Sequence, residues 1–176
     1  MKYNLSIWRK LLLFISVALP CFYLQAPTNA EDRKKVSIRM ESFGDSMRHW
    51  YGIHDDGNII NPKANQPRYP ETEITKIADN ILLYQRNNGG WPKNCDMPAI
   101  LTPEQVDSLQ KTKEQHHTTF DNSTTYTHIE YLAKVYSLTQ ISKYKDACLK
   151  GISFVLEAQY LEWQKKWAPE KNVLSK

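Results

Sequence analysis

The sequence predicts an all-α fold built from antiparallel helix pairs. Apolar residues recur at helical spacing through three long segments after residue 70. No segment alternates apolar and polar residues with the period of two that marks a half-buried strand. Once the first thirty residues are set aside, about 146 residues remain, which is the length of one ordinary domain.

Residues 1–30 have the composition of a secretory signal peptide. The positive charges at its start are Lys2, Arg9 and Lys10. The uncharged apolar run over residues 11–19 is too short for a stable membrane span, and the small residues at 28–30 suit cleavage. This pattern predicts a secreted or periplasmic protein. Cys21 raises the question of a lipoprotein, but Pro20 before it does not suit a lipidation site, so we do not expect one.

The charge balance argues against a nucleic-acid partner. The chain has 23 Lys and Arg against 19 Asp and Glu. Residues 1–30 hold three of the basic residues and none of the acidic ones, so the remainder carries 20 against 19. A nearly neutral chain lacks the basic excess typical of nucleic-acid-binding domains. Any attraction for an anionic substrate must therefore be local, and the oligomeric state stays open.

The first elements of the expected domain are short. Residues 31–41 are charged and are expected to be loose, and residues 42–51 predict a short helix. Residues 52–70 are rich in Pro, Gly, Asn and Asp, which predicts an ordered loop or a linker. A first amphipathic helix is expected over residues 73–87. Its apolar stripe consists of Ile74, Ile77, Ala78, Ile81 and Leu82.

Three further helices follow. A short one is expected to begin near Pro103, because Thr102 is a good N-cap and Gln105 completes a capping box. Longer helices are expected over residues 122–140 and 142–160. The first carries Tyr126, Ile129, Leu132, Ala133 and Tyr136 on one side. The second carries an unbroken apolar stripe of Tyr144, Ala147, Cys148, Gly151, Ile152, Val155 and Leu156.

The segment Asn88–Asn94 (NGGWPKN) interrupts the helical pattern. Gly89 and Gly90 allow the positive φ angles that end a helix tightly. Trp91 adds a flat apolar ring, and Lys93 adds a mobile cation. One interpretation is a helix C-cap followed by a packing tryptophan. The other is a stiff loop that stacks its ring on a charged sugar and pairs its ammonium with the sugar carboxylate.

A second polar stretch precedes the helix expected over residues 122–140. In it, Asp121 and Asn122 stand where a helix N-cap belongs, and capping is the simpler interpretation. The alternative is that they offer oxygen ligands to a hard cation beside a sugar. Calcium takes six to eight oxygens, so other side chains, water and the substrate would have to supply the rest.

The cysteines and histidines show no spacing typical of a metal site. His116 and His117 are adjacent and do not share a helix face, so a solvated loop is expected. Cys95 and Cys148 either pair in an oxidising compartment or remain buried thiols.

Three stretches, in this order, resemble family 10 polysaccharide lyases, the α/α-toroid pectate lyases. They are Asn88–Asn94, Thr119–Thr127 (TFDNSTTYT) and Ala158–Tyr160 (AQY). The similarity continues through residues 77–87 and 132–136. It covers roughly residues 42–160, which we interpret as a partial pectate-lyase-like domain.

The resemblance implies an incomplete α/α toroid that acts on polygalacturonate by calcium-dependent β-elimination, the reaction of pectin degradation. The residue matching Asp121 belongs to the Ca²⁺ centre, and Trp91, Lys93 and Asn122 are the candidate substrate-binding residues. Elimination removes a proton next to an ionised carboxylate. A cation on that carboxylate makes the proton more acidic, and a base then takes it.

The sequence also departs from the family. The family's base is an arginine that falls beyond the end of this sequence, so no residue is assigned as catalytic. Residues 161–176 lack the second Gly-Gly-Trp-Pro of the relatives and form a divergent tail. We therefore expect a truncated chain with impaired catalysis. Its last helix should leave three apolar residues partly exposed: Ile152, Val155 and Leu156.

Two alternatives stay open: a non-catalytic uronate-binding remnant, or another α/α-toroid enzyme such as an unsaturated uronide hydrolase, which would normally need two carboxyl groups. Arg48 and Arg86 are the arginines nearest the motifs. Neither is assigned as a base, and Arg86 is expected to be a surface charge on its helix. His128 either faces the sugar groove or is a hydrogen-bonded structural histidine.

Overall fold

The computed structural model describes residues 38–52 and 58–167, with side chains as far as residue 161. Its helices in chain order are η1 (Glu41–Phe43), α3 (Gly44–Gly52), α4 (Ile74–Tyr84), α5 (Pro103–Lys111), α6 (Tyr126–Thr139) and α7 (Ser142–Trp167). Within the described ranges there is no strand, only an isolated bridge between Arg68 and Ala99. The all-α class is confirmed. The expected signal peptide and the end of the tail lie outside the described residues.

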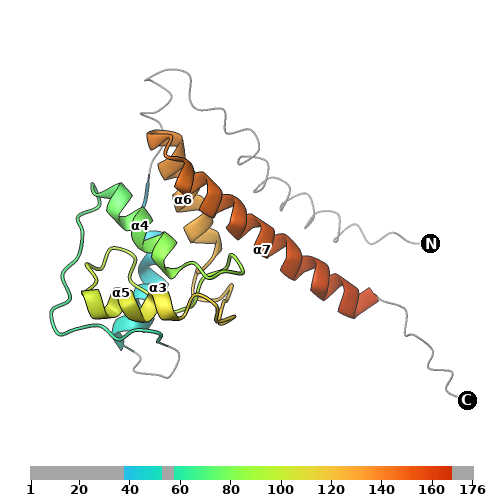
Figure 1. Cartoon of the computed structure of the whole chain (residues 1–176), viewed down its shortest axis with the longest axis horizontal. Coiled ribbons are helices and arrows are strands. Elements are labelled where there is room, and N and C mark those ends of the chain that lie inside the picture. Colours follow the sequence, from blue (N-terminus) through green and yellow to red (C-terminus); the bar gives the residue numbers. More distant parts are fainter. Residues whose placement is uncertain (1–37, 53–57, 168–176) are drawn as a thin grey trace, which may run out of the picture.

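The helices α6 and α7 form a hairpin that carries α4 on one side (Figure 1). The turn between them is residues 140–141, and Gln140 ends α6 in the left-handed conformation. This hairpin is the helix pair that the apolar stripes predict. The incomplete α/α toroid stays a prediction. No helix in the described part of the chain is long and apolar enough to span a bilayer.

The core lies where α4, α6 and α7 meet the loop after α4. Trp91 lies at its centre, fully buried, and its indole Nε1 donates to the Ile81 carbonyl at 2.8 Å. The helical residues that are most deeply buried with it are Ile77, Ile81, Leu132, Val135 and Tyr144. A buried indole N–H needs an acceptor, and the helix carbonyl supplies it. The loop is therefore fixed to the helix layer through its tryptophan.

The capping box at α5 is confirmed. Thr102 Oγ1 accepts from the Gln105 amide at 3.3 Å, and Gln105 Oε1 accepts from the Thr102 amide at 2.9 Å. Pro103 occupies the first helical turn, where its missing N–H costs nothing. Local chemistry alone sets this helix start.

The end of α4 differs from the prediction. The helix stops at Tyr84, three residues before the expected end, and Gln85 is already extended. Lys113 Nζ donates to the carbonyls of Leu82 and Gln85 at 2.9 and 2.8 Å, so a cation from a distant loop caps the negative end of the helix dipole. The prediction that Gly89 and Gly90 end the helix is therefore wrong, because Gln85 is the C-cap residue.

The last two helices also have different bounds from those expected. Helix α6 begins at Tyr126 rather than near residue 122, because positive φ angles at Asn122, Ser123 and Thr125 are incompatible with a helix. Tyr126 is 53 % exposed and does not belong to the core stripe. Helix α7 continues to Trp167, past the expected end at residue 160, and its C-terminal half extends beyond the other helices (Figure 1).

The apolar stripe of α7 is buried only in its first half. Cys148 and Gly151 are buried, Ile152 and Val155 are half-buried, and Leu156 is 52 % exposed. The partial exposure of these last three residues is confirmed.

Cys95 and Cys148 are both buried and are not joined by a disulfide, and burial raises the pKa of the Cys95 thiol to about 12.

Candidate functional site

An open cleft of about 700 Å³ lies between three segments of the chain. Its lining residues are Asn58, Ile59, Pro92, Lys93, Thr112, Gln115, His117, Thr118, Thr119 and Asp121. Two of the segments named above contribute to it: Asn88–Asn94, here called the first motif, and Thr119–Thr127, the second motif. Lys93 from the first motif and Asp121 from the second are both exposed and line this cleft. Two of the expected site residues therefore line one cleft, although helix α5 lies between them in the sequence.

Asn122 links the two motifs. Its Nδ2 donates to Asn94 Oδ1 at 3.1 Å, and both residues have positive φ angles, 51° and 58°. Asparagine is one of the few residues with a side chain that enters this region readily. Asn122 is not among the residues that line the cleft. Its role in sugar binding stays a prediction.

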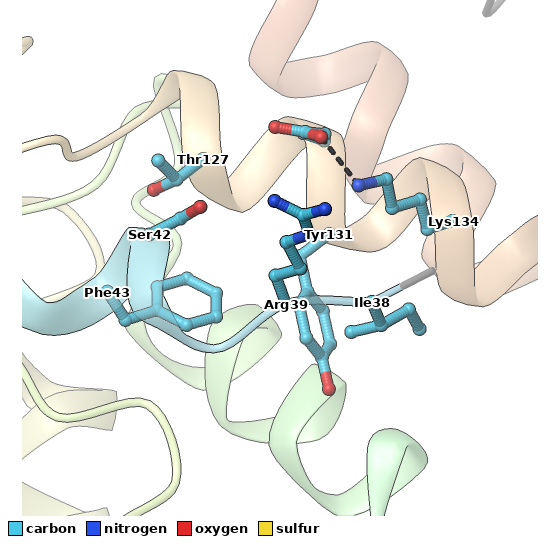
Figure 2. A pocket seen from close by; sticks show the side chains of 8 residues that line it. Ile38, Arg39, Ser42, Phe43, Thr127, Tyr131 and Lys134 are labelled. Atoms are coloured by element: carbon cyan, nitrogen blue, oxygen red, sulfur yellow. Dashed lines mark ion pairs between the residues drawn. The ribbon is translucent and has the colours of Figure 1, made fainter. Parts of the chain in front are cut away.

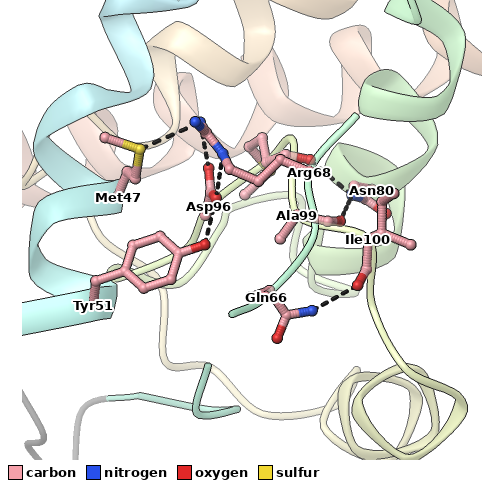
Figure 3. A network of polar contacts seen from close by, with 9 residues as sticks. Met47, Tyr51, Gln66, Arg68, Asn80, Asp96, Ala99 and Ile100 are labelled. Atoms are coloured by element: carbon pink, nitrogen blue, oxygen red, sulfur yellow. Dashed lines mark hydrogen bonds and ion pairs between the residues drawn. The ribbon is translucent and has the colours of Figure 1, made fainter. Parts of the chain in front are cut away.

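The buried carboxylate of Asp96 holds the loop that carries Lys93 and Asn94 (Figure 3). Arg68 pairs with it through Nε at 2.8 Å and Nη2 at 3.1 Å, and Tyr51 Oη donates to it at 3.0 Å. Burial raises the pKa of the Asp96 carboxyl, while Arg68 opposes that rise. Burial and Asp96 together raise the pKa of Tyr51 to about 12.

The same loop is fixed further along by backbone acceptors. Asn80 Nδ2 donates to the carbonyls of Met97 and Ala99, both at 2.7 Å, and Gln66 Nε2 donates to the Ile100 carbonyl at 2.6 Å (Figure 3). The loop after Lys93 thus has no regular secondary structure yet is tied down by buried polar side chains. Lys93 therefore projects from a rigid base.

Trp91 does not have the position that sugar stacking requires. Its ring is fully buried, packed between His128, whose ring centroid is 5.3 Å away, and Gly151 of α7. The expectation of a sugar-stacking ring is wrong for this structure, and the packing interpretation of the tryptophan is confirmed. The physical reason is that the ring covers the core between α4 and α7, where it buries more apolar area than at a surface.

Arg86 corrects a second expectation, because it is 1 % exposed rather than a surface charge. Its Nη1 donates to the carbonyl and hydroxyl oxygens of Thr112, a cleft residue. Its Nε and Nη2 have no hydrogen-bond partner among the described residues. Burial lowers the pKa of Arg86. Arg86 therefore affects the cleft indirectly, by fixing the lining residue Thr112.

The rest of that segment is bound to the first motif. Asn87 N–H donates to the Lys113 carbonyl at 2.9 Å, Asn88 Nδ2 donates to Thr118 Oγ1 at 3.2 Å, and the Thr119 amide donates to the Trp91 carbonyl at 2.9 Å. These bonds join two loops that are far apart in sequence and that both contribute residues to the cleft.

The ammonium of Lys113, which caps α4, has a lowered pKa. Burial, together with nearby Arg86, lowers the pKa of Lys113 to about 8.

Residues 119–125, here called the Asp121 loop, are compact and strained. The Asp121 amide donates to Thr119 Oγ1 at 3.0 Å, and the Asp121 carbonyl accepts from the Thr124 amide at 2.9 Å. Thr125 has φ 61° and ψ −65°, and the Tyr126 amide donates to the Thr124 carbonyl across it at 2.7 Å. This is a γ-turn with a positive φ, a rare and strained conformation. Asp121 therefore lies in a loop of defined shape, and the simple N-cap interpretation does not apply.

His128 is a structural histidine, the second of the two interpretations. It is 1 % exposed, stacks on Phe43 at 5.5 Å, and its Nδ1 accepts from the Thr125 amide at 3.3 Å. Burial lowers the pKa of His128 to about 3. The imidazole is neutral at physiological pH, with its proton on Nε2.

The described residues do not make a complete calcium site. Among the described residues, Asp121 is the one carboxylate that lines the cleft, and no group of three or more His, Cys, Asp or Glu is placed to hold a metal. His116 and His117 lie in an exposed loop, as expected. The donor chemistry suits a hard cation, but Ca²⁺ needs six to eight oxygens. These residues alone would hold it weakly.

A second hollow is too small for a ligand. It has a volume of about 10 Å³ and lies between η1 and α6, beside the ion pair of Lys134 and Glu130 (Figure 2). A space of this size holds about one water molecule. The larger cleft is therefore the candidate site.

Sequence reasoning missed Asp96, Lys113 and Thr125. Asp96 depends on Arg68, and Lys113 depends on the end of α4, so neither role is readable from neighbouring residues. Thr125 is an ordinary residue in an extraordinary conformation. The one signal in the sequence is its position three residues before His128, the spacing of a capping box.

Residues 85–171 match the model of a known protein family, which is described as pectic acid lyase. No curated protein and no solved structure matches the chain. The matched range contains the first motif, the Asp121 loop, α6 and α7. The match supports a pectate-lyase-like family and a pectate-lyase-like function for this chain.

Proposed function

We propose that the cleft binds polygalacturonate or a related acidic polysaccharide, as part of a family 10 pectate lyase module that acts by calcium-dependent β-elimination. The observation that carries this proposal is that Lys93 and Asp121 both line one open cleft. A uronate chain presents a carboxylate on each sugar, and a cation beside a metal-binding carboxylate is complementary to that pattern. A secreted or periplasmic location, as expected from residues 1–30, suits a polymeric substrate.

Each residue has a distinct part in this proposal. Lys93 pairs with a uronate carboxylate. Asp121 would contribute one oxygen ligand to Ca²⁺, and other side chains, water and the substrate would supply the rest, so metal and sugar would bind together. Asn122 holds the Lys93 loop against the Asp121 loop through Asn94. The calcium would supply charge neutralisation of the uronate, which acidifies the neighbouring proton.

The described residues favour binding over turnover. No arginine is among the residues that line the cleft in the described part of the chain, and Arg86 is buried behind its bonds to Thr112 rather than exposed to the cleft. Binding that is equal in the ground and transition states does not accelerate a reaction. Loss of a general base commonly costs about a hundred- to ten-thousand-fold in rate. We therefore propose that this chain by itself binds uronate with little lyase activity, in line with the non-catalytic alternative.

The test is calorimetric titration of the chain with trigalacturonate and Ca²⁺. Lys93→Gln and Asp121→Asn should each weaken binding by about three- to tenfold, because each removes a charge contact at a partly solvated site. The matched control is Lys111→Gln, which removes an exposed lysine of α5 outside the cleft and should bind like the unmodified chain. Equal affinities for all four proteins would contradict the proposal.

The same samples identify the chemistry with polygalacturonate. Elimination yields a conjugated product that absorbs in the ultraviolet, whereas hydrolysis yields reducing ends without that absorbance. We expect no elimination at the rate of roughly one per second or more that is typical of enzymes. Such a rate, abolished by Asp121→Asn, would show that a residue of this chain serves as the base.

A further inference from the structure

Thr125 and His128 hold the end of the Asp121 loop. Both are buried, and neither is among the residues that line the cleft. Thr125 is fully buried, and its Oγ1 donates to the Thr119 carbonyl at 2.7 Å. Thr119 in turn accepts the Asp121 amide at its own Oγ1, at 3.0 Å. Thr125 thus closes the loop by joining its end to its beginning.

This closure requires a strained backbone. A β-branched residue at φ 61° and ψ −65° is a genuine outlier. Such strain persists only when the surroundings over-determine it, and it gathers beside functional groups. Asn122 and Ser123 also have positive φ angles, so three of the four residues after Asp121 are in this region.

His128 supplies the constraint at Thr125. Its Nδ1 accepts the Thr125 amide at 3.3 Å, in the place where a capping box normally uses Glu or Gln. The imidazole is itself fixed by Phe43 of η1 and by Trp91 of the first motif. The His128 side chain therefore connects the strained turn to the core, beside the backbone bond between Thr119 and Trp91.

We infer that His128 and Thr125 are positioning residues, which hold the loop in the shape that lets Asp121 line the cleft together with Lys93. The importance of this geometry for uronate binding rests on the function proposed above. The positioning itself does not, because it concerns the shape of the loop without any ligand. His128 acts through its acceptor at Nδ1 and not through contact with the sugar.

The test compares His128→Gln, which keeps a side-chain acceptor, with His128→Met, which has similar length and only a weak one. Amide hydrogen exchange of the whole chain is measured at neutral pH. In the Met variant the amides of Asp121, Thr124 and Thr125 should exchange about tenfold faster, while amides of α4 keep their protection. The Gln variant should retain most of the loop protection.

Three results would overturn the inference: unchanged exchange in the Met variant, equal acceleration of loop and α4 amides, or a Gln variant as fast as the Met variant. A second measurement needs no variant. The ring nitrogens of His128, observed by long-range ¹H–¹⁵N spectroscopy, should show the proton on Nε2, and a proton on Nδ1 would refute the acceptor role. Trigalacturonate titration is scored separately, so failure of binding in every protein would count against the proposed function alone.

Discussion

Thr125, His128 and Trp91 form a continuous path from the strained turn to the centre of the core. Thr125 bonds to His128, and the His128 ring lies 5.3 Å from that of Trp91. The Trp91 carbonyl in turn accepts a hydrogen bond from the Thr119 amide, so Trp91 is also bonded to the start of the Asp121 loop. At the scale of single residues, the shape of the cleft therefore depends on buried groups more than on the groups that line it.

The burial of His128 predicts how stability depends on pH. Its pKa falls from 6.5 to about 3 on folding. Between these values the unfolded chain binds a proton that the folded chain does not, so the free energy of unfolding rises with pH across this window and is lost on acidification. The slope from this group is at most about 1.4 kcal/mol per pH unit.

Denaturant titrations of the unmodified chain and of His128→Gln between pH 4 and about 7 measure this contribution. Carboxylates titrate in both proteins, so the difference between the two curves isolates the imidazole. The variant should have the flatter curve. Parallel curves would contradict the burial of a neutral His128.

Single residues also show what the sequence can and cannot predict. Lys93 and Asp121 could be singled out because their motifs carry a characteristic order of residue types, and both line the cleft, while their roles in binding stay predictions. Trp91 and Arg86 could not be placed, because burial depends on packing partners that come from α7 and from the segment after α5. The same residue types are consistent with a surface and with a core.

At the scale of elements, local chemistry predicts helix starts better than helix ends. The capping box of α5 lies within four consecutive residues and is confirmed. The end of α4 depends on Lys113, which lies 28 to 31 residues away along the chain. The start of α6 depends on the strained loop before it. These contacts are tertiary, so helical periodicity does not reveal them.

Glycine in the middle of α7 has a packing role that can be tested. A Cβ at Gly151 would lie 2.8 Å from ring atoms of Trp91 and from Ile129 Cγ1. Alanine favours a helix over glycine by about 1 kcal/mol, but overpacking of a core costs about 1–3 kcal/mol. Gly151→Ala should therefore destabilise the chain by about 1 kcal/mol, as measured by denaturant unfolding.

Gly52→Ala provides the matched control for that measurement. A Cβ there meets no atom of the described residues within 4 Å, and the residue ends α3. This variant should be neutral or slightly stabilising. A Gly151→Ala protein as stable as the Gly52→Ala protein would show that α7 does not approach Trp91 as closely as described.

At the scale of the whole molecule, one end of α7 and the cleft are the two notable surfaces. The C-terminal half of α7 presents Leu156, Tyr160 and Leu161, each more than half exposed. The cleft, by contrast, presents Lys93 and Asp121 from the two family motifs. The chain thus combines a buried core around Trp91 with an open cleft that Lys93 and Asp121 line.

The most direct test of the central claim compares two ligands on the unmodified chain. Trigalacturonate and its fully methyl-esterified form have the same sugar skeleton and differ in the carboxylates that Lys93 and Ca²⁺ would bind. In the presence of Ca²⁺, calorimetric titration should show at least about tenfold tighter binding of the acid form, equivalent to about 1.4 kcal/mol. Equal or tighter binding of the ester would contradict recognition of uronate carboxylates by this cleft.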